Sequence, residues 1–160
     1  MATANPQIDY VAELLSVTKT YRAVSPQARY NTIRQRLDQA EIGATKLVSI
    51  VSAVEGLARS VAVHNKAPNE SSVVSLYASY CSRAPTTLVE EVFKFYRAGS
   101  PSTYFKDDTW PLFRHAVNYR NLVVHECTYL GQDKYPSLID ASFGVLESVA
   151  TLAGLRAQRT

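Results

Sequence analysis

Residues 47–61 read LVSIVSAVEGLARSV, and this stretch sets the class of the fold. Its apolar side chains recur every three or four residues, at Leu47, Ile50, Val51, Val54, Leu57, Ala58 and Val61. That spacing is the period of an α-helix, and the apolar face is broad enough for a helix at the centre of a hydrophobic core. Glu55 is the only acidic residue within 47–63, so it stands out in an otherwise apolar segment.

The same helical spacing continues along the rest of the chain, and no run alternates with the period of a β-strand. Proline, glycine and capping residues divide it into helices at about 6–23, Pro26 to Asn65 with a break or bend at Gly43, Ser71 or Ser72 to Ser82, Pro85 to Arg97, Asp107 or Asp108 to Leu130, and Ser137 to Arg156. We therefore predict a single all-α domain, an up-and-down helical bundle of five to seven helices.

The composition is that of an ordinary globular domain. Of the 160 residues, 46% are hydrophobic and 19% are charged, which is enough apolar material for one sizeable core. Six Gly and seven Pro are too few for a loop-rich fold or a β-sandwich. The net charge of +3 is compatible with an anionic partner, but it is far from that of a protein that coats nucleic acid.

Cys81 and Cys127 lie in apolar helical context without a C-x-x-C pair, so we expect buried, reduced thiols rather than a disulfide framework or a zinc site. The N-terminus lacks a basic segment followed by an apolar one, so no signal peptide is expected. No apolar run approaches the roughly 18 residues that a membrane span needs. We therefore expect a cytoplasmic protein without a membrane partner.

Residues 120–125, RNLVVH, combine three side chains that suit phosphodiester chemistry. Arginine binds phosphate, and histidine transfers protons near neutral pH. Asn121 lies between Arg120 and His125 and can orient either of them. These groups are sufficient to cleave a phosphodiester bond without a metal or other cofactor.

A projection at about 100° per residue divides the helix that carries this motif into two faces. One face is apolar and is expected to pack on the bundle: Phe113, Ala116, Tyr119, Val123, Val124, Cys127 and Leu130. The other is a polar stripe without an acid: Arg114, Asn118, Asn121, His125 and Tyr129. Asn121 and His125 are four residues apart, so their side chains are neighbours.

Arg120 begins inside the apolar face, where an unpaired guanidinium would be very costly. We predict that it forms a bidentate ion pair with Glu55. Arg120 also projects about 140° away from His125, so one helix does not bring the two together. A two-fold axis near Asn121 would place the arginine of one chain beside the histidine of another, which predicts a homodimer.

An R-N-x-x-x-H motif in the penultimate helix of an all-α domain resembles the HEPN superfamily, whose members are small helical bundles. Many of them are metal-independent endoribonucleases with an R-x(4–6)-H motif and a polar residue directly after the arginine. The mid-chain helix with an acid, VEGLAR at 54–59, is similar as well. The resemblance is strongest over 110–155 and implies a HEPN-like core at about 45–156, preceded by a helical extension at about 6–44.

The resemblance implies that His125 acts as the general base on the 2′-hydroxyl or as the acid at the leaving 5′-oxygen. Arg120 would stabilise charge on the scissile phosphate, and Asn121 would orient the histidine or the phosphate. Supporting roles would fall to Glu55, Arg114, Asn118 and Tyr129. The implied partners are RNA, a second copy of the chain and, for a toxin or defence effector, an antitoxin protein.

Two other functions fit the same sequence. One is a non-catalytic HEPN-like module that binds RNA, nucleotide or a partner protein. The other is a helical interaction domain with a coincidental motif, in which Arg120 serves only an ion pair and His125 is structural. Outside the motif, we expect Arg29, Arg34 and Arg36 to form a solvated face, and Lys94, Arg97 and Lys106 to flank a loop that is suited to RNA.

Overall fold

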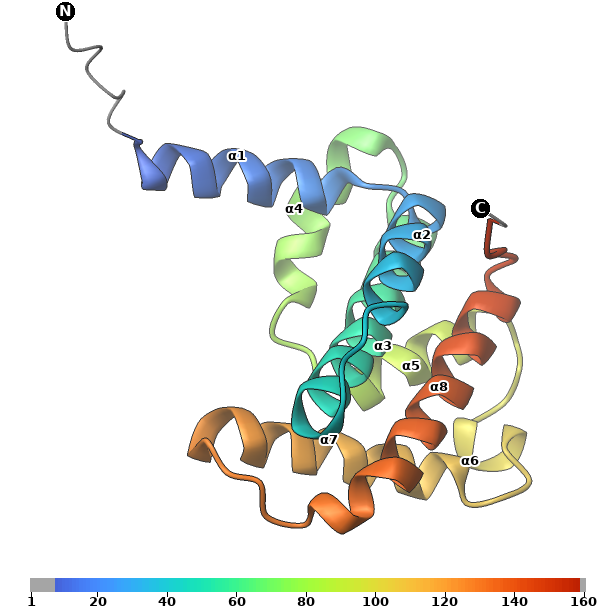
Figure 1. Cartoon of the computed structure of the whole chain (residues 1–160). Coiled ribbons are helices and arrows are strands. Elements are labelled where there is room, and N and C mark those ends of the chain that lie inside the picture. Colours follow the sequence, from blue (N-terminus) through green and yellow to red (C-terminus); the bar gives the residue numbers. More distant parts are fainter. Residues whose placement is uncertain (1–7, 159–160) are drawn as a thin grey trace, which may run out of the picture.

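The computed structural model describes residues 8–158, of which 76% are helical and none lies in a strand, so the predicted all-α bundle is confirmed. Figure 1 shows the helices α1 (Tyr10–Ala23), α2 (Pro26–Leu37), α3 (Gly43–Lys66), α4 (Glu70–Tyr80), α5 (Pro85–Phe95), α6 (Pro101–Tyr104), α7 (Thr109–Glu126) and α8 (Tyr135–Leu152), with a 3-10 turn at Gln132–Lys134. The described residues hold eight helices, one more than the upper end of the predicted range, because α6 adds a single turn.

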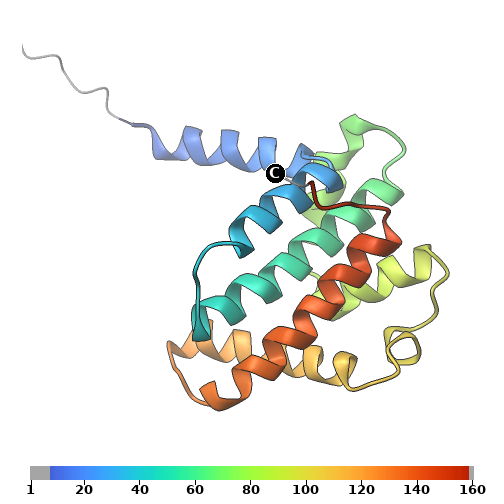
Figure 2. The ribbon, with the colours of Figure 1, turned by 45° about the vertical axis from the view of Figure 1, so that its right-hand side comes forward.

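Helix α3 is the centre of the core, as its apolar repeat predicted. It packs against α2, α4, α5, α7 and α8, and the last of these runs alongside it for most of its length (Figure 2). The buried residues of α3 include every apolar position of the predicted face: Leu47, Ile50, Val51, Val54, Leu57, Ala58 and Val61. Its length and composition would also suit a membrane span, but 61% of its most apolar window is buried inside the bundle.

The break between α2 and α3 falls at residues 38–42, directly before Gly43. Gly43 has a φ of +57°, a backbone conformation that residues with a Cβ rarely adopt. Ser25 caps α2 through the backbone N–H of Ala28, with Pro26 at the first helical position, as predicted. Asn69 caps α4 through the backbone N–H of Ser72. The predicted caps, Ser71 or Ser72, were therefore two or three residues too late in the sequence.

The motif helix α7 ends earlier than predicted. It stops at Glu126, and Cys127 takes a left-handed conformation with a φ of +49°, where Leu130 had been expected to close the helix. Gly131 has a φ of +76°, and a Cβ at this position would collide with the ring of Tyr119, so only glycine fits. Helix α8 then starts at Tyr135, two residues before the predicted start.

The predicted burial of the two cysteines was wrong, since Cys81 and Cys127 are exposed free thiols. Each follows the last residue of a helix, where the backbone leaves the packed face of that helix. Arg29 departs from the predicted solvated face, because it is 1% exposed and its guanidinium is stacked between the rings of Tyr21 and Tyr77. Helix α1 differs from all the others of similar length, since none of its residues is buried and it extends away from the body (Figure 1).

Candidate functional site

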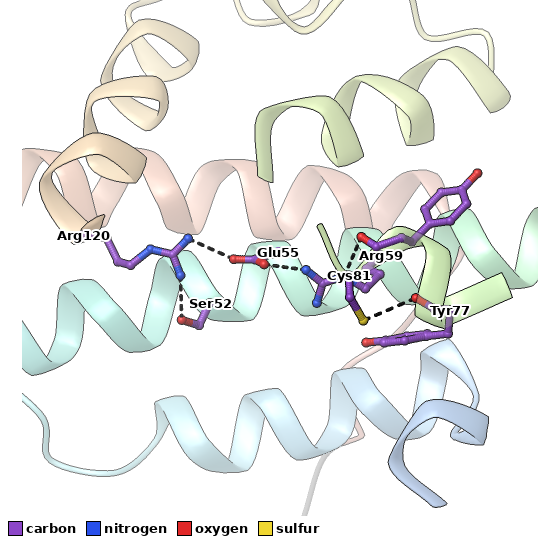
Figure 3. Close-up of polar contacts among 7 residues, drawn as sticks. Ser52, Glu55, Arg59, Tyr77, Cys81 and Arg120 are labelled. Carbon is purple, nitrogen blue, oxygen red and sulfur yellow. Dashed lines mark hydrogen bonds and ion pairs between the residues drawn. The ribbon is translucent and has the colours of Figure 1, made fainter. Parts of the chain in front are cut away.

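Arg120 lies where α7 meets α3, and its guanidinium is held by two side chains of α3 (Figure 3). Its Nη2 donates to Glu55 Oε2 at 2.9 Å, and its Nη1 donates to Ser52 Oγ at 3.4 Å. The side chain is 16% exposed, and its Nε is buried without a partner among the described residues. The predicted Arg120–Glu55 ion pair is therefore confirmed, and it fixes the guanidinium at the edge of the core.

The predicted bidentate geometry is wrong, because Glu55 is shared between two arginines. Its Oε1 accepts a hydrogen bond from Arg59 Nη2 at 2.5 Å, which leaves only Oε2 for Arg120. Two guanidinium charges and one carboxylate give this cluster a net charge of +1. A partly buried cluster with excess positive charge attracts an anion, and it does so most strongly where water is scarce.

Arg59 is anchored more firmly than Arg120. Its Nε donates to the carbonyl of Tyr80 at 3.3 Å, and its guanidinium lies 5.8 Å from the centre of the Tyr77 ring (Figure 3). Burial alone would lower the pKa of Arg59, but its hydrogen bonds and charge interactions with Glu55 and Tyr77 outweigh burial and raise that pKa. Arg59 is therefore a fixed cation that holds Glu55 in place, whereas Arg120 retains a solvent-facing side.

The polar stripe of α7 is exposed, as predicted. Asn121 and His125 point away from the core, and neither side chain forms a hydrogen bond with another described residue. Arg114 and Asn118 are also exposed, about two turns and one turn before Asn121 on the same helix. Tyr129, however, lies beyond the end of α7 and is 73% exposed, so it does not extend the stripe along the helix.

The apolar face of α7 is covered over only half of its length. Phe113, Ala116 and Val117 are buried, whereas Val124 is 53% exposed, and Leu130, which lies beyond the end of the helix, is 70% exposed. The prediction that this whole face packs on the bundle was therefore wrong for the last turns. The reason is geometric, since the end of α7 passes beyond α3 and α8 (Figure 1).

Within one chain the structure gathers Arg120, Glu55 and Ser52, but His125 takes no part in that cluster. His125 is one and a half turns beyond Arg120 and on another side of the helix, as the projection predicted. Ser52 also lines a cavity of about 360 Å³ between α2 and α3, next to Gly56. Arg120 is therefore connected to this cavity through its hydrogen bond with Ser52.

The cations predicted to flank an RNA loop lie at the opposite end of α7. Lys94 and Arg97 line a cavity of about 580 Å³ together with Trp110, the second residue of that helix. Trp110 precedes His125 by fifteen positions, about 22 Å along the helix axis. Lys106 is exposed in the same region. These side chains can contact a long ligand that reaches the motif, but they are not part of its immediate surroundings.

Ser52 and Arg59 are the site residues that sequence reasoning missed. Both could have been found from their distance to Glu55, because side chains three and four residues apart share one face of a helix. Comparisons of the chain with family models, with curated proteins and with solved structures found no match. The resemblance to HEPN domains therefore remains an expectation from the sequence, which none of these comparisons tests.

Proposed function

We propose that the protein is a metal-independent endoribonuclease of the HEPN kind, which cleaves RNA by attack of the 2′-hydroxyl on the adjacent phosphate. The supporting observation is that Arg120 is anchored by Glu55 and Ser52, while Asn121 and His125 are exposed on another side of the same helix. A guanidinium has five N–H donors, and Arg120 uses two of them on Glu55 and Ser52. One hydrogen on each terminal nitrogen is left, which suits two oxygens of a phosphate.

In this reaction His125 removes the proton of the 2′-hydroxyl or protonates the leaving 5′-oxygen. The 2′-oxygen bonds to phosphorus, the bond to the 5′-oxygen breaks, and the products are a 2′,3′-cyclic phosphate and a 5′-hydroxyl. Arg120 stabilises the charge that develops on the phosphate, and Asn121 orients the imidazole or the phosphate. RNA is the proposed partner, and a toxin or defence role with an antitoxin protein is one setting for such an activity.

Arg120 and His125 would come from different chains. Because Glu55 tethers Arg120 to α3, it cannot swing around α7 to the histidine of its own chain. A second motif helix, related by a two-fold axis near Asn121, would present its His125 to this arginine. The uncovered apolar residues at the end of α7 are consistent with a contact at that axis, since Val124 and Leu130 gain cover there.

An RNA digest in chelator, followed by end-group analysis, tests the reaction. We expect cyclic phosphate ends from the wild type and a rate at least about 100-fold lower for His125→Ala, the usual loss for a general acid or base. His115→Ala is the matched control, since His115 is an exposed histidine on the same helix outside the motif. Cleavage that persists in His125→Ala, or that never appears in the wild type, would contradict the proposal.

Mixed dimers test the shared site. An equimolar mixture of Arg120→Ala and His125→Ala chains regains one intact site in each mixed dimer, so about a quarter of the wild-type activity should return. No recovery would place both groups in one chain. Unfolding of Arg120→Ala should be measured in parallel, because this substitution also frees one oxygen of Glu55.

A non-catalytic RNA-binding module is the second candidate, and one observation favours it. Arg120 already satisfies a structural role, because it holds α7 to α3 through Glu55 and Ser52. This candidate predicts salt-dependent RNA binding without a cyclic phosphate product. The digest above separates the two, since binding without cleavage supports only the second candidate.

A further inference from the structure

Helix α1 presents an apolar face that no residue within 8–158 buries. Tyr10, Leu14, Val17 and Tyr21 are 75%, 67%, 54% and 47% exposed. At about 100° per residue these four side chains fall within about 60° of one another, so they form one stripe along the helix. Contiguous apolar surface of this kind is uncommon on a monomer and marks a site of association.

The stripe has the spacing of a helix-pairing seam. Its positions are separated by four, three and four residues, which is the pattern of the a and d positions in a coiled coil. The order Tyr-Leu-Val-Tyr is also self-complementary for antiparallel copies, because Tyr10 then meets Tyr21 of the partner and Leu14 meets Val17 of the partner. Rings pair with rings and aliphatic side chains with aliphatic ones, as a two-fold contact requires.

The charges of the arm favour the same orientation. Its acids, Asp9 and Glu13, lie at the N-terminal end, whereas Lys19 and Arg22 lie toward the C-terminal end. An antiparallel pair sets each acidic end beside a basic end, and a parallel pair would set like charges together. The seam itself holds no charged residue, so antiparallel pairing buries none.

The base of α1 is fixed to the body, so the arm holds a defined direction. The buried Arg29 of α2 donates from Nη2 to the carbonyl of Tyr21 at 2.5 Å, and its guanidinium lies 4.0 Å from the centre of the Tyr21 ring. Thr18 and Arg22 are half-buried on the side that faces α4, the main contact of the arm. The seam is centred about 90° around the helix from these two residues, and its side chains are exposed.

A pair of arms alone is a small interface. Each α1 is about 21 Å long, and two such helices bury less than the roughly 800 Å² per partner of a standard interface. The end of α7 and the segment after it supply more apolar surface, since Leu122, Val124 and Leu130 are 39%, 53% and 70% exposed. The N-terminal end of α1 and the C-terminal end of α7 extend toward the same side of the body (Figure 1, Figure 2). One two-fold axis on that side can therefore serve both.

We propose that α1 is a dimerisation arm that pairs antiparallel with the α1 of a second copy of this chain, through the seam Tyr10–Leu14–Val17–Tyr21. The pairing is argued from α1 itself and does not depend on RNA cleavage. It gives the segment before the core a function, because it holds two chains together at the axis on which the two motif helices would meet.

Sedimentation of the full chain over a range of concentrations tests the arm. The wild type should be a dimer at micromolar concentration. Leu14→Glu with Val17→Glu should raise the dissociation constant at least about 100-fold, since four buried apolar side chains per dimer are lost. Ala12→Glu with Ser16→Glu is the matched control, because it adds the same charge at exposed positions outside the seam and should leave the dimer intact. Circular dichroism and thermal unfolding report whether each variant folds.

Disulfide trapping tests the orientation, with the two exposed cysteines first replaced by serine. Antiparallel pairing keeps two Tyr10→Cys positions about 16 Å apart, too far for a disulfide, but brings Tyr10→Cys beside Tyr21→Cys of the partner. The equimolar mixture should cross-link in up to about half of the chains, and each variant alone should not. Cross-linking of Tyr10→Cys alone would overturn the antiparallel arrangement.

A wild type that stays monomeric would overturn the proposal, and so would a dimer that persists in the Leu14→Glu, Val17→Glu variant. Neither result depends on catalysis, so neither contradicts the ribonuclease proposal, which the RNA digest tests separately. A negative digest would likewise not contradict the proposed dimerisation through α1.

Discussion

Helices α1 and α3 both carry apolar side chains at helical spacing, but those of α1 are exposed whereas those of α3 are buried in the core. None of the residues of α1 is buried, whereas eleven residues of α3 are. Helix α3 has neighbours on nearly every side, and α1 rests mainly on α4 and on Arg29. An apolar repeat therefore predicts which side of a helix needs cover, but not whether the same chain provides that cover.

The largest test of this contrast removes one leucine from each helix. Leu57→Ala in α3 should lower the free energy of unfolding by about 2–5 kcal/mol, because Leu57 is fully buried and its loss leaves a cavity. Leu14→Ala in α1 should change it by less than about 0.5 kcal/mol, since an exposed position loses little on truncation. Urea unfolding of dilute protein measures both, because dilution removes any contribution from association. Equal losses of unfolding free energy in the two variants would contradict the difference in burial between α1 and α3.

The second test concerns the polar residue within the apolar helix. Glu55→Gln should lower the free energy of unfolding by about 1–3 kcal/mol, because it leaves Arg59 and Arg120 as close, partly buried cations without their shared carboxylate. Glu91→Gln is the matched control, since Glu91 pairs with Arg83 alone and both are more exposed. Its effect should stay below about 1 kcal/mol. Denaturant unfolding of the two variants side by side gives the difference, and a larger loss for Glu91→Gln would contradict the central role of the cluster.

The smallest test detaches α1 without disturbing α3. Arg29→Met removes the hydrogen bond to the Tyr21 carbonyl and the stacking on Tyr21 and Tyr77, so amide hydrogens of α1 should exchange roughly tenfold faster. The global stability should change by no more than about 1 kcal/mol, because two nitrogens of Arg29 are buried with no hydrogen-bond partner among residues 8–158, and methionine avoids that cost. Hydrogen exchange should be measured in the Leu14→Glu, Val17→Glu background, where α1 is unpaired. Faster exchange in α3 would show that the two helices are not independent.

Much of the fold followed from the sequence, because helix periods and caps are local properties. The central helix, the break before Gly43 and the Ser25–Pro26 start were all predicted correctly. The end of α7 was not, since apolar spacing continued to Leu130 although the helix stops at Glu126. The left-handed Cys127 ends the helix there, and Gly131 then passes so close to the Tyr119 ring that a Cβ would collide with it.

The candidate site was predictable in part, for a similar reason. The Arg120–Glu55 pair could be predicted because a guanidinium that starts on the packed face of a helix needs an acid, and the central helix offers only one. The sharing of that acid with Arg59 was missed, although the i,i+4 spacing carried the signal. The exposure of His125 followed from its place on the polar stripe. Its relation to an arginine of another chain is a proposal that one chain cannot test.

By itself, the sequence determined the helical class, the identity of the central helix, the two faces of α7 and the need of Arg120 for an acid. These depend on the order of side chains along a helix, which geometry fixes within a few turns. Only the tertiary structure decided which apolar faces are covered, where α7 ends, and that Arg29 is buried while both cysteines are not. Burial depends on which segments meet in space, and a local repeat carries no information about that meeting.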